Sequence, residues 1–313
     1  MREAAIGPEA GGSGAAIADS FDADKRRFYR FCIWPLALIL IVITLVPMIY
    51  LVAISFTPLN LTQPQTFGDF SQPIRNYQFL TEDGRFHNSL WVQAKLSLWS
   101  VGLQLLFGFL LALFLNLRSS FLETLRTVFL IPMVLPPIVV AVIWKMMYTP
   151  AISPFHWSAA ALGFEIPSLI ASPDWALTAI IVAEIWQGFP FTMLMVLAAL
   201  QMMPEEYIEA ARIDGANVWQ TTLHVTLPFL KGVLLAAGLF RLIDSMKAFP
   251  LIYLLTEGGP GEVTEVTNYY SFTLAFNFSF LGYSSAITVI LMAMTIVLTW
   301  AIVKIVRRGE ALV

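Results

Sequence analysis

The sequence predicts an all-α protein that crosses a membrane six times. Of its 313 residues, 58% are hydrophobic and 12% are charged, and the mean hydropathy is +0.74. Ordinary soluble domains are about half apolar and about a quarter charged, so this composition favours a membrane protein. Six stretches also reach the length of about 20 mostly apolar residues that a membrane-crossing helix needs. They are Phe31–Phe56, Leu90–Asn116, Leu125–Tyr148, Trp175–Leu200, Pro228–Leu255 and Gly282–Val306.

The composition also excludes several kinds of site. The single cysteine, Cys32, rules out an intrachain disulfide and a cysteine-based metal cluster. The three histidines lie far apart in the sequence, so we expect no metal site. No Gly-Lys pair is present, which rules out a P-loop, so we expect no cofactor in this chain. The net charge of −3, with scattered basic residues, gives no sign of a nucleic-acid partner.

The N-terminal residues precede the first predicted span. Met1–Asp24 is rich in glycine and alanine and has no apolar run, so residues 1–30 are predicted to be a disordered cytoplasmic tail. The first span is too long for the apolar region of a signal peptide, and we interpret it as an uncleaved anchor. Residues 31–308 then form the membrane domain, and residues 309–313 a short C-terminal tail.

Basic residues predict the orientation of the spans, because Lys and Arg accumulate in short cytoplasmic loops. The connections Pro150–Asp174 and Thr256–Leu281 contain no Lys or Arg. Only the first outer loop departs from this pattern, with Arg75 and Arg85. Both termini are therefore predicted to be cytoplasmic, on the side that holds Lys25, Arg26, Arg27, Arg30, Arg118, Arg126, Arg212, Lys231, Arg307 and Arg308.

The longest cytoplasmic connection, within residues 201–228, has the signals of two short helices. Pro204 suits the first turn of a helix, and the acidic residues after it complement the helix dipole. Gly215 suits a left-handed stop, and Asn217 can cap a second short helix that ends near Pro228. The adjacent alanines Ala210 and Ala211 would allow another protein to approach closely. On these facts alone, a plain surface helix is the favoured reading.

The string in this connection resembles the EAA signature of ABC importer permeases, E-A-A-x3-G-x9-I-x-L-P. Glu209-Ala210-Ala211, Gly215 and Val225-Thr226-Leu227-Pro228 match it, with only Val225 in place of isoleucine. The resemblance implies the type I importer permease fold, with a coupling helix that docks into an ATPase subunit. The implied coupling residues are Glu209, Ala210, Ala211, Asp214, Gly215, Leu227 and Pro228.

Further strings resemble the carbohydrate branch of these permeases, in its shorter six-span form. They are Trp186–Phe191, Pro204–Tyr207 and Leu254–Pro260, and the resemblance covers roughly Phe31 to Arg308. It implies a subunit without catalytic activity in the plasma membrane of a bacterial cell. The implied partners are a second homologous permease, two copies of an ATPase that binds ATP and Mg, a periplasmic or extracellular solute-binding protein, and a sugar-like substrate.

Polar residues inside the predicted spans point to function, because they are costly in lipid. Lys95 and Lys145 lie near outer span ends, where their long side chains can reach water. Glu184 lies deeper and would either pair with a neighbouring helix or face the pore. Gly188 and Pro190 interrupt the fourth span, since proline leaves the carbonyl of Trp186 without its helical donor. Such a break either lines a cavity or is a packed kink.

The fifth span places four residues on one helical face, at spacings of three and four. The resemblance to the maltose-type subunit implies that this face contacts sugar together with part of the fourth span. The implied residues are Gln187, Gly188, Phe191, Arg241, Asp244, Ser245 and Ala248. A plain alternative is that Arg241 and Asp244 form a buried ion pair that only fixes packing.

Three functions are compatible with six spans. The EAA segment fits an ABC importer pore for a sugar, glycoside or polyol. It fits such a pore for a non-sugar solute equally well. An ion-coupled carrier would use Glu184 and Asp244 as an ion relay, but it needs no ATPase dock. An intramembrane enzyme has no support, because no His/Asp/Ser constellation is recognisable across the spans.

Overall fold

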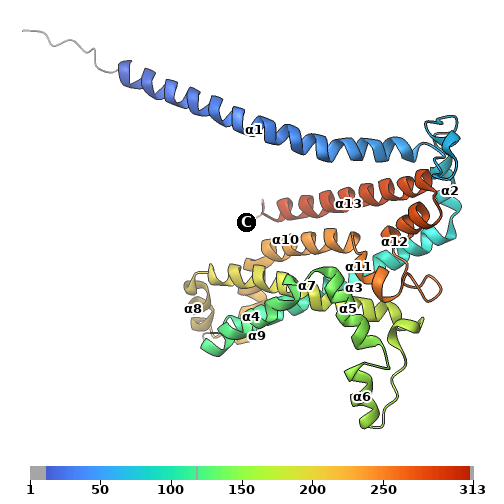
Figure 1. Ribbon diagram of the computed structural model, residues 1–313. Helices are drawn as coiled ribbons and strands as arrows, with labels where there is room; N and C mark the ends of the chain where they lie inside the picture. The colour runs from blue at the N-terminus through green and yellow to red at the C-terminus, as the bar shows by residue number, and fades with distance from the viewer. Residues whose placement is uncertain (1–11, 118, 311–313) are drawn as a thin grey trace, which may run out of the picture. The chain divides into compact units, whose positions relative to one another are not determined.

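The computed structural model describes residues 12–117 and 119–310, and over these residues the chain forms helices and loops without a β-strand (Figure 1). Two short 3-10 turns (Pro64–Thr66 and Leu169–Ala171) and two π-helical turns (Thr222–Thr226 and Thr273–Asn277) join the α-helices. The α-helices are α1 Gly12–Ser55, α2 Arg75–Glu82, α3 Gly84–Leu115, α4 Ser120–Val134, α5 Pro137–Tyr148, α6 Pro154–Ala161, α7 Ala176–Gln201, α8 Glu205–Ile213, α9 Val218–Thr221, α10 Leu227–Met246, α11 Pro250–Leu255, α12 Thr267–Phe272 and α13 Leu281–Glu310.

The chain divides into two units, Met1–Ala53 and Ile54–Val313. The described part of the first unit is the helix α1, whose stretch Phe31–Ser55 is apolar enough to cross a membrane. The helix already begins at Gly12, so it covers residues for which the sequence predicts disorder. Alanine-rich segments continue a helix at little cost once a long helix has formed next to them. Residues 1–11 of the predicted tail, and 311–313 at the other terminus, lie outside the described residues.

Five helical stretches are long and apolar enough to span a membrane, and a bent pair of helices provides a sixth candidate span. The sequence predicts a single helix over Leu125–Tyr148, and this prediction is wrong in detail. The stretch is broken into α4 and α5, which meet at an angle of 98°. Pro136 and Pro137 explain the break, because proline lacks an amide donor and disfavours helical geometry in the residue before it.

The predicted fifth span is also shorter than expected. α10 ends at Met246, and a separate short helix, α11, begins at Pro250. Lys247 closes α10 with its amide bonded to the carbonyl of Asp244 at 3.0 Å. Pro250 then starts α11 at a first-turn position, where its missing amide costs nothing. The helix is therefore interrupted within the predicted span.

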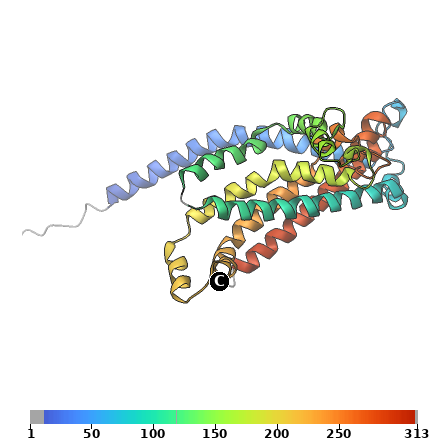
Figure 2. The ribbon, with the colours of Figure 1, turned by 90° about the horizontal axis from the view of Figure 1, so that it is seen from below.

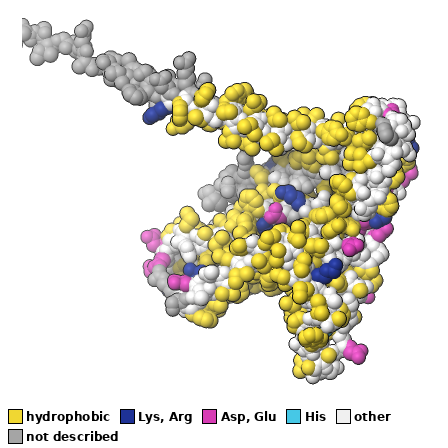
Figure 3. Space-filling view, viewed as in Figure 1, with side chains coloured by type: hydrophobic (Ala, Val, Ile, Leu, Met, Phe, Trp, Pro, Cys, Tyr) yellow, Lys and Arg dark blue, Asp and Glu magenta, His cyan; other side chains and the backbone are white. Residues whose placement is uncertain are grey.

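The second unit is built around α3 and α7, which pack along each other with α10 beside them (Figures 1 and 2). On the face that Figure 3 shows, most of the surface is apolar, and charged side chains lie near the ends of the bundle and in a small group at its middle. One side of α3 instead carries five buried polar residues at helical spacing, Ser89, Gln93, Ser97, Ser100 and Gln104. This α3 polar seam faces neighbouring helices, so its groups can bond inside the protein rather than to lipid.

Small residues let α3 and α7 approach closely. A side chain at Gly188 would overlap the Gln104 side chain, and one at Gly108 would come within 2.5 Å of Thr192. The amide of Gln104 donates to the backbone carbonyl of Glu184 at 2.8 Å. The sequence predicts an interrupted fourth span, but α7 runs from Ala176 to Gln201 without a break. Pro190 is buried within it, so the packed kink is the reading that fits.

Candidate functional site

The two-helix segment at one end of the bundle has the local structure that the sequence predicts. α8 begins directly after Pro204, with Glu205 and Glu206 in its first turn. Gly215 has a φ of +77°, a conformation that favours glycine. Asn217 and Gln220 form a reciprocal capping box at the start of α9, with both hydrogen bonds at 2.9 Å. We call residues 204–228 the elbow.

The elbow exposes large apolar side chains that the sequence analysis did not single out. Ile213 is 86% exposed, Val218 84% and Trp219 68%. Of the predicted coupling residues, Glu209, Ala210, Asp214, Gly215 and Pro228 are exposed, Leu227 is partly buried and Ala211 is buried. Exposed apolar patches with polar residues around them are typical of protein-interaction surfaces. The elbow can therefore present a docking surface to another protein.

A second group of predicted residues meets between α7 and α10. The guanidinium of Arg241 donates to the carboxylate of Asp244 at 2.5 Å, and its central carbon lies 4.5 Å from the centre of the Phe191 ring. Phe191 also packs edge-on against Phe240 at 5.9 Å. The Asp244 side chain is 55% exposed, and that of Arg241 is 18% exposed. This arrangement combines an aromatic face with hydrogen-bonding groups.

Gln187 connects this group to the bend between α4 and α5. Its side-chain amide lies 3.4 Å from the carbonyl oxygen of Leu135, the residue directly after the end of α4. The backbone of Leu135 is extended, so this carbonyl does not continue the helical hydrogen bonds of α4. Gln187 is thus placed to stabilise the bend.

The remaining predicted residues of the two spans are buried rather than open. The hydroxyl of Ser245 donates to Ser97 of the α3 polar seam at 2.9 Å, and its carbonyl accepts from Gln93 at 3.0 Å. Ala248 belongs to the main hydrophobic core. The open face of α10 therefore holds Arg241 and Asp244 but not the other two predicted residues.

The lysines of the predicted spans lie at the surface. The ammonium group of Lys95 lies 5.1 Å from the centre of the Trp91 ring. Lys145 is exposed in the last turn of α5. No group of three or more possible metal-ligating residues occurs in the part of the chain that the structure describes.

At the end of the bundle opposite the elbow, a polar network joins three distant segments. Asp83 caps α3 and accepts hydrogen bonds from the hydroxyls of Tyr270 and Tyr283 at 2.7 and 2.6 Å. Arg85 donates two hydrogen bonds to Glu265 and lies 3.2 Å from Glu262. Burial favours a raised pKa for Asp83, but the hydrogen bonds from the two tyrosines and the backbone hold its pKa below the ordinary value. We call these five residues and Glu262 the outer network.

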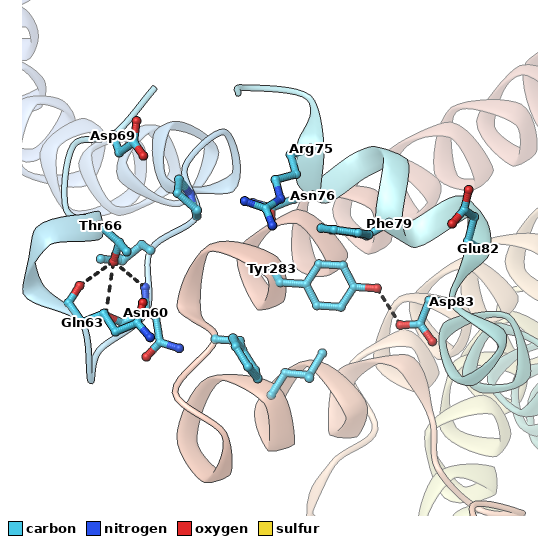
Figure 4. Close-up of a pocket in the computed structure, with 14 residues that line it drawn as sticks. Asn60, Gln63, Thr66, Asp69, Arg75, Asn76, Phe79, Glu82, Asp83 and Tyr283 are labelled. Atoms are coloured by element: carbon cyan, nitrogen blue, oxygen red, sulfur yellow. Dashed lines mark hydrogen bonds between the residues drawn. The ribbon is translucent and has the colours of Figure 1, made fainter. Parts of the chain in front are cut away.

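A pocket of about 730 Å³ adjoins the outer network (Figure 4). Arg75 and Phe79 stand together on α2 at its edge, with the guanidinium 5.3 Å from the ring centre. Tyr283 lies below Phe79 in the close-up and is joined to Asp83 by its hydrogen bond, while Asn60, Gln63 and Thr66 lie at the left. The pocket is lined by aromatic, amide and carboxylate side chains, including Asn60, Gln63, Asp69, Glu82 and Phe280.

Comparison with known proteins places the chain among transport proteins. Residues 104–309 match the family described as "Binding-protein-dependent transport system inner membrane component". The trehalose/maltose transport system permease protein of Thermococcus litoralis is 35% identical over 75% of this chain and 79% of its own length. The sulfoquinovosyl glycerol transport system permease protein of Agrobacterium fabrum is 34% identical over 92% and 93%.

Solved structures show the same fold at lower identity. A chain of a bacterial alginate ABC transporter, crystallised with a periplasmic protein that holds an alginate pentasaccharide, aligns with a TM-score of 0.79. The alignment covers 92% of this chain and 97% of that chain, at 20% identity. The predicted fold, that of a type I ABC importer permease, is confirmed.

Proposed function

The chain belongs to the family of binding-protein-dependent transport system inner membrane components, and we propose that it forms one half of a pore that imports a sugar, a glycoside or a polyol. The substrates named for the relatives, trehalose/maltose and sulfoquinovosyl glycerol, support this class of solute. The subunit itself has no catalytic role in this proposal. ATP and Mg are bound, and ATP is hydrolysed, on a separate ATPase subunit.

The observation that carries the proposal is the elbow. A membrane protein gains nothing from exposing Ile213, Val218 and Trp219 at one end of the bundle unless another protein covers them. The capping box and the left-handed Gly215 make the segment stiff, so a push on α8 is passed to α10. Closure of a docked ATPase would then move α10 as a rigid body and open the pore to alternate sides.

The proposed assembly places the elbow and both termini in the cytoplasm of a bacterial cell. A second, homologous permease completes the pore, two ATPase copies dock below, and a solute-binding protein docks above. Arg85, in the first outer loop, departs from the predicted distribution of basic residues. It nevertheless fits this orientation, because Glu262 and Glu265 neutralise its charge. A functional homodimer purified without a second permease would contradict the heterodimer.

The proposed solute path lies along the open faces of α7 and α10. Gln187, Phe191, Arg241 and Asp244 are the residues that would contact solute there. Gly188, Ser245 and Ala248 lie behind them and would act by packing, since each is buried. Sugars are bound by aromatic faces and paired donors and acceptors, which this group offers.

The proposed function is tested by substitutions inside and outside the elbow, each measured in the reconstituted complex. Ile213→Asp and Trp219→Ala are expected to abolish solute-stimulated ATP hydrolysis while the permease remains at normal abundance in the membrane. Leu162→Asp, at a residue that is 75% exposed outside the elbow, tests whether a new charge at any exposed apolar position has the same effect. Normal ATP-driven uptake by both elbow variants would contradict the proposal. Uptake by the purified subunit alone with an ion gradient would instead favour the ion-coupled carrier.

A further inference from the structure

The connection Pro150–Asp174, which the sequence predicts to be an outer loop, carries the short helix α6 away from the bundle. α5 ends at Tyr148, whose hydroxyl donates to the carbonyl of Ala179 at 2.9 Å, and the chain returns to the bundle at Ala176, where α7 begins. Between these two points α6 lies beside the bundle and not beyond the tip at α2 (Figure 1). We call residues 150–164 the α6 segment.

The level at which this segment leaves the bundle is that of a membrane interface. The 26 residues of α7 make about 39 Å of helix, which exceeds the hydrocarbon thickness of about 30 Å. The first turn of α7, which Tyr148 contacts, therefore lies near one boundary of the bilayer. α4 packs against α7, and α5 meets α4 at 98°, so α5 runs across the spans. The α6 segment continues sideways from there, into the region that lipid occupies.

α6 exposes apolar side chains on opposite sides. None of its residues, all of which the structure describes, is buried. Phe155 is 56% exposed and Trp157 63%, although two helical positions place them on nearly opposite sides of the helix. Leu162 and Phe164, directly after α6, are exposed as well. A protein partner covers one face of a helix, whereas lipid surrounds it, so exposure on both sides favours lipid.

The distribution of charge in the connection fits the same environment. The α6 segment contains no Asp, Glu, Lys or Arg, and the charged residues of the connection are Glu165 and Asp174, which follow it. Charged side chains are costly in hydrocarbon, so their absence from the α6 segment keeps that cost low. Trp157 and Trp175 are both exposed, and tryptophan is enriched where hydrocarbon meets the headgroups.

The backbone groups at both ends of α6 find partners within the segment. At the start, the hydroxyl of Ser153 accepts from the amide of His156 at 3.3 Å. At the end, the amides of Leu162, Gly163 and Phe164 donate to carbonyls of the last two turns of α6, at 2.9–3.3 Å. The φ of +82° at Gly163 allows this closure. Backbone groups in lipid must be satisfied internally, so α6 can enter the bilayer at little cost.

We propose that the α6 segment is a membrane anchor, which lies among the lipid acyl chains of the leaflet opposite the elbow. Glu165, directly after it, stays in the headgroup region. The anchor holds α5 across the spans and so supports the bend between α4 and α5. This inference goes beyond the proposed function, because it depends neither on the solute nor on the direction of transport.

A spin label can report what surrounds the α6 segment. Cys32 is the only cysteine of the chain, so Cys32→Ser is the background for single labels at Phe155→Cys and Trp157→Cys. The assembled complex is placed, without ATP, in nanodiscs of phosphatidylethanolamine and phosphatidylglycerol. Collisions of the label with oxygen, which concentrates among acyl chains, are compared with collisions with a water-soluble nickel chelate. Gln65→Cys, at an exposed residue of the loop after α1, is the aqueous reference.

The ratio of oxygen to nickel collisions should be at least about tenfold higher at both α6 positions than at the Gln65 position, because a polar chelate enters an apolar medium unfavourably. The solute-binding protein, when added, should not change it. A ratio equal to the reference would place α6 in water and overturn the proposal. Loss of access to both reagents, at either position, would show that a protein covers α6. Whether that protein is the second permease or the solute-binding protein, this result also overturns the proposal.

A second test adds charge to the α6 segment. Phe155 and Leu162 are seven positions apart and lie on one side, so Phe155→Asp with Leu162→Asp opposes insertion there. With the label at Trp157→Cys, this charged variant should lower the collision ratio towards the aqueous reference. Phe155→Leu with Leu162→Ala is the matched apolar control and should keep the ratio high. An unchanged ratio in the charged variant overturns the proposal.

The fold should survive these substitutions, because α6 has no buried residue, and thermal unfolding of the labelled complex checks this. Neither test uses ATP or a solute. A failure of the anchor proposal is therefore separate from a failure of ATP-driven uptake, which would contradict the proposed function.

Discussion

Arg85 donates hydrogen bonds to both carboxylate oxygens of Glu265, at 2.6 and 2.9 Å, although the two residues are 180 positions apart in the sequence. Glu265 is only 1% exposed, so its charge depends on this partner. The pair fixes the start of α3 to the loop before α12. It is therefore a clamp between these two segments at the end of the bundle opposite the elbow.

Removing the guanidinium should destabilise the subunit. Arg85→Ala leaves the buried carboxylate of Glu265 without its partner, and we expect a loss of about 1.5–3 kcal/mol. Thermal unfolding of the purified complex measures the effect. Arg75→Ala is the control, because Arg75 faces the Phe79 ring and should matter little. Equal loss in both variants would exclude a clamp.

The hydrogen bonds of Asp83 in the outer network predict that the stability of the subunit depends on pH. The pKa of Asp83 is lowered in the folded protein, so its contribution to stability is present above its ordinary pKa of about 3.9. The contribution is lost as the pH falls through the lower, folded pKa. Asp83→Asn should therefore lower the unfolding temperature at pH 7, and the difference from the unchanged protein should shrink towards pH 3. A difference that is constant from pH 7 to pH 3 would contradict this assignment.

The close approach of α3 and α7 makes Gly188 sensitive to size. Gly188→Ala should destabilise the subunit by about 1–3 kcal/mol, because the new methyl group overlaps Gln104. Gly102→Ala is the matched control, since no atom beyond its chain neighbours and the nearby backbone of its own helix lies within 4 Å of the methyl group that alanine would add there. Thermal unfolding of the purified complex compares the two variants. Adding Gln104→Ala should restore part of the lost stability, and no recovery in the double variant would mean that the overlap is not the cause.

The elbow should depend on the backbone conformation of Gly215. Gly215→Pro should leave the protein inserted but cut ATP-driven transport severely, because proline cannot adopt a φ of +77°. Gly215→Asn should retain most transport, since asparagine tolerates this conformation. Glu209→Lys should also uncouple transport by reversing an exposed charge. Normal transport by the proline and lysine variants, at normal abundance, would show that the elbow does not couple.

A substitution in the Arg241–Asp244 pair can distinguish a role in packing from a role in solute contact. Asp244 is half exposed, so Asp244→Asn should assemble normally yet weaken transport or change which sugars stimulate ATP hydrolysis. Thermal stability and solute preference are measured on the same preparation. Poor assembly together with unchanged preference would identify the pair as a packing element only.

Local signals explain what could be predicted from the sequence. The spans follow from apolar length, and the elbow follows from Gly215 and Asn217, whose effects act within a few residues. Pro136 and Pro137 signal the break between α4 and α5, but the apolar length of the stretch favours a single span. The burial of Ser245 could not be predicted from helical spacing, because spacing groups residues on a face without identifying the helix that covers them. For the same reason, the pairing of Arg85 with Glu265 could not be predicted from the sequence.

The α3 polar seam has a consequence for how the protein is made. Gln104 bonds to a carbonyl 80 residues later, and Gln93 to one 152 residues later. During synthesis α3 therefore enters the bilayer before the carbonyl groups of α7 and α10 that these two amides bind have left the ribosome. Its first position in the lipid is provisional, and the later helices complete its insertion by supplying those partners.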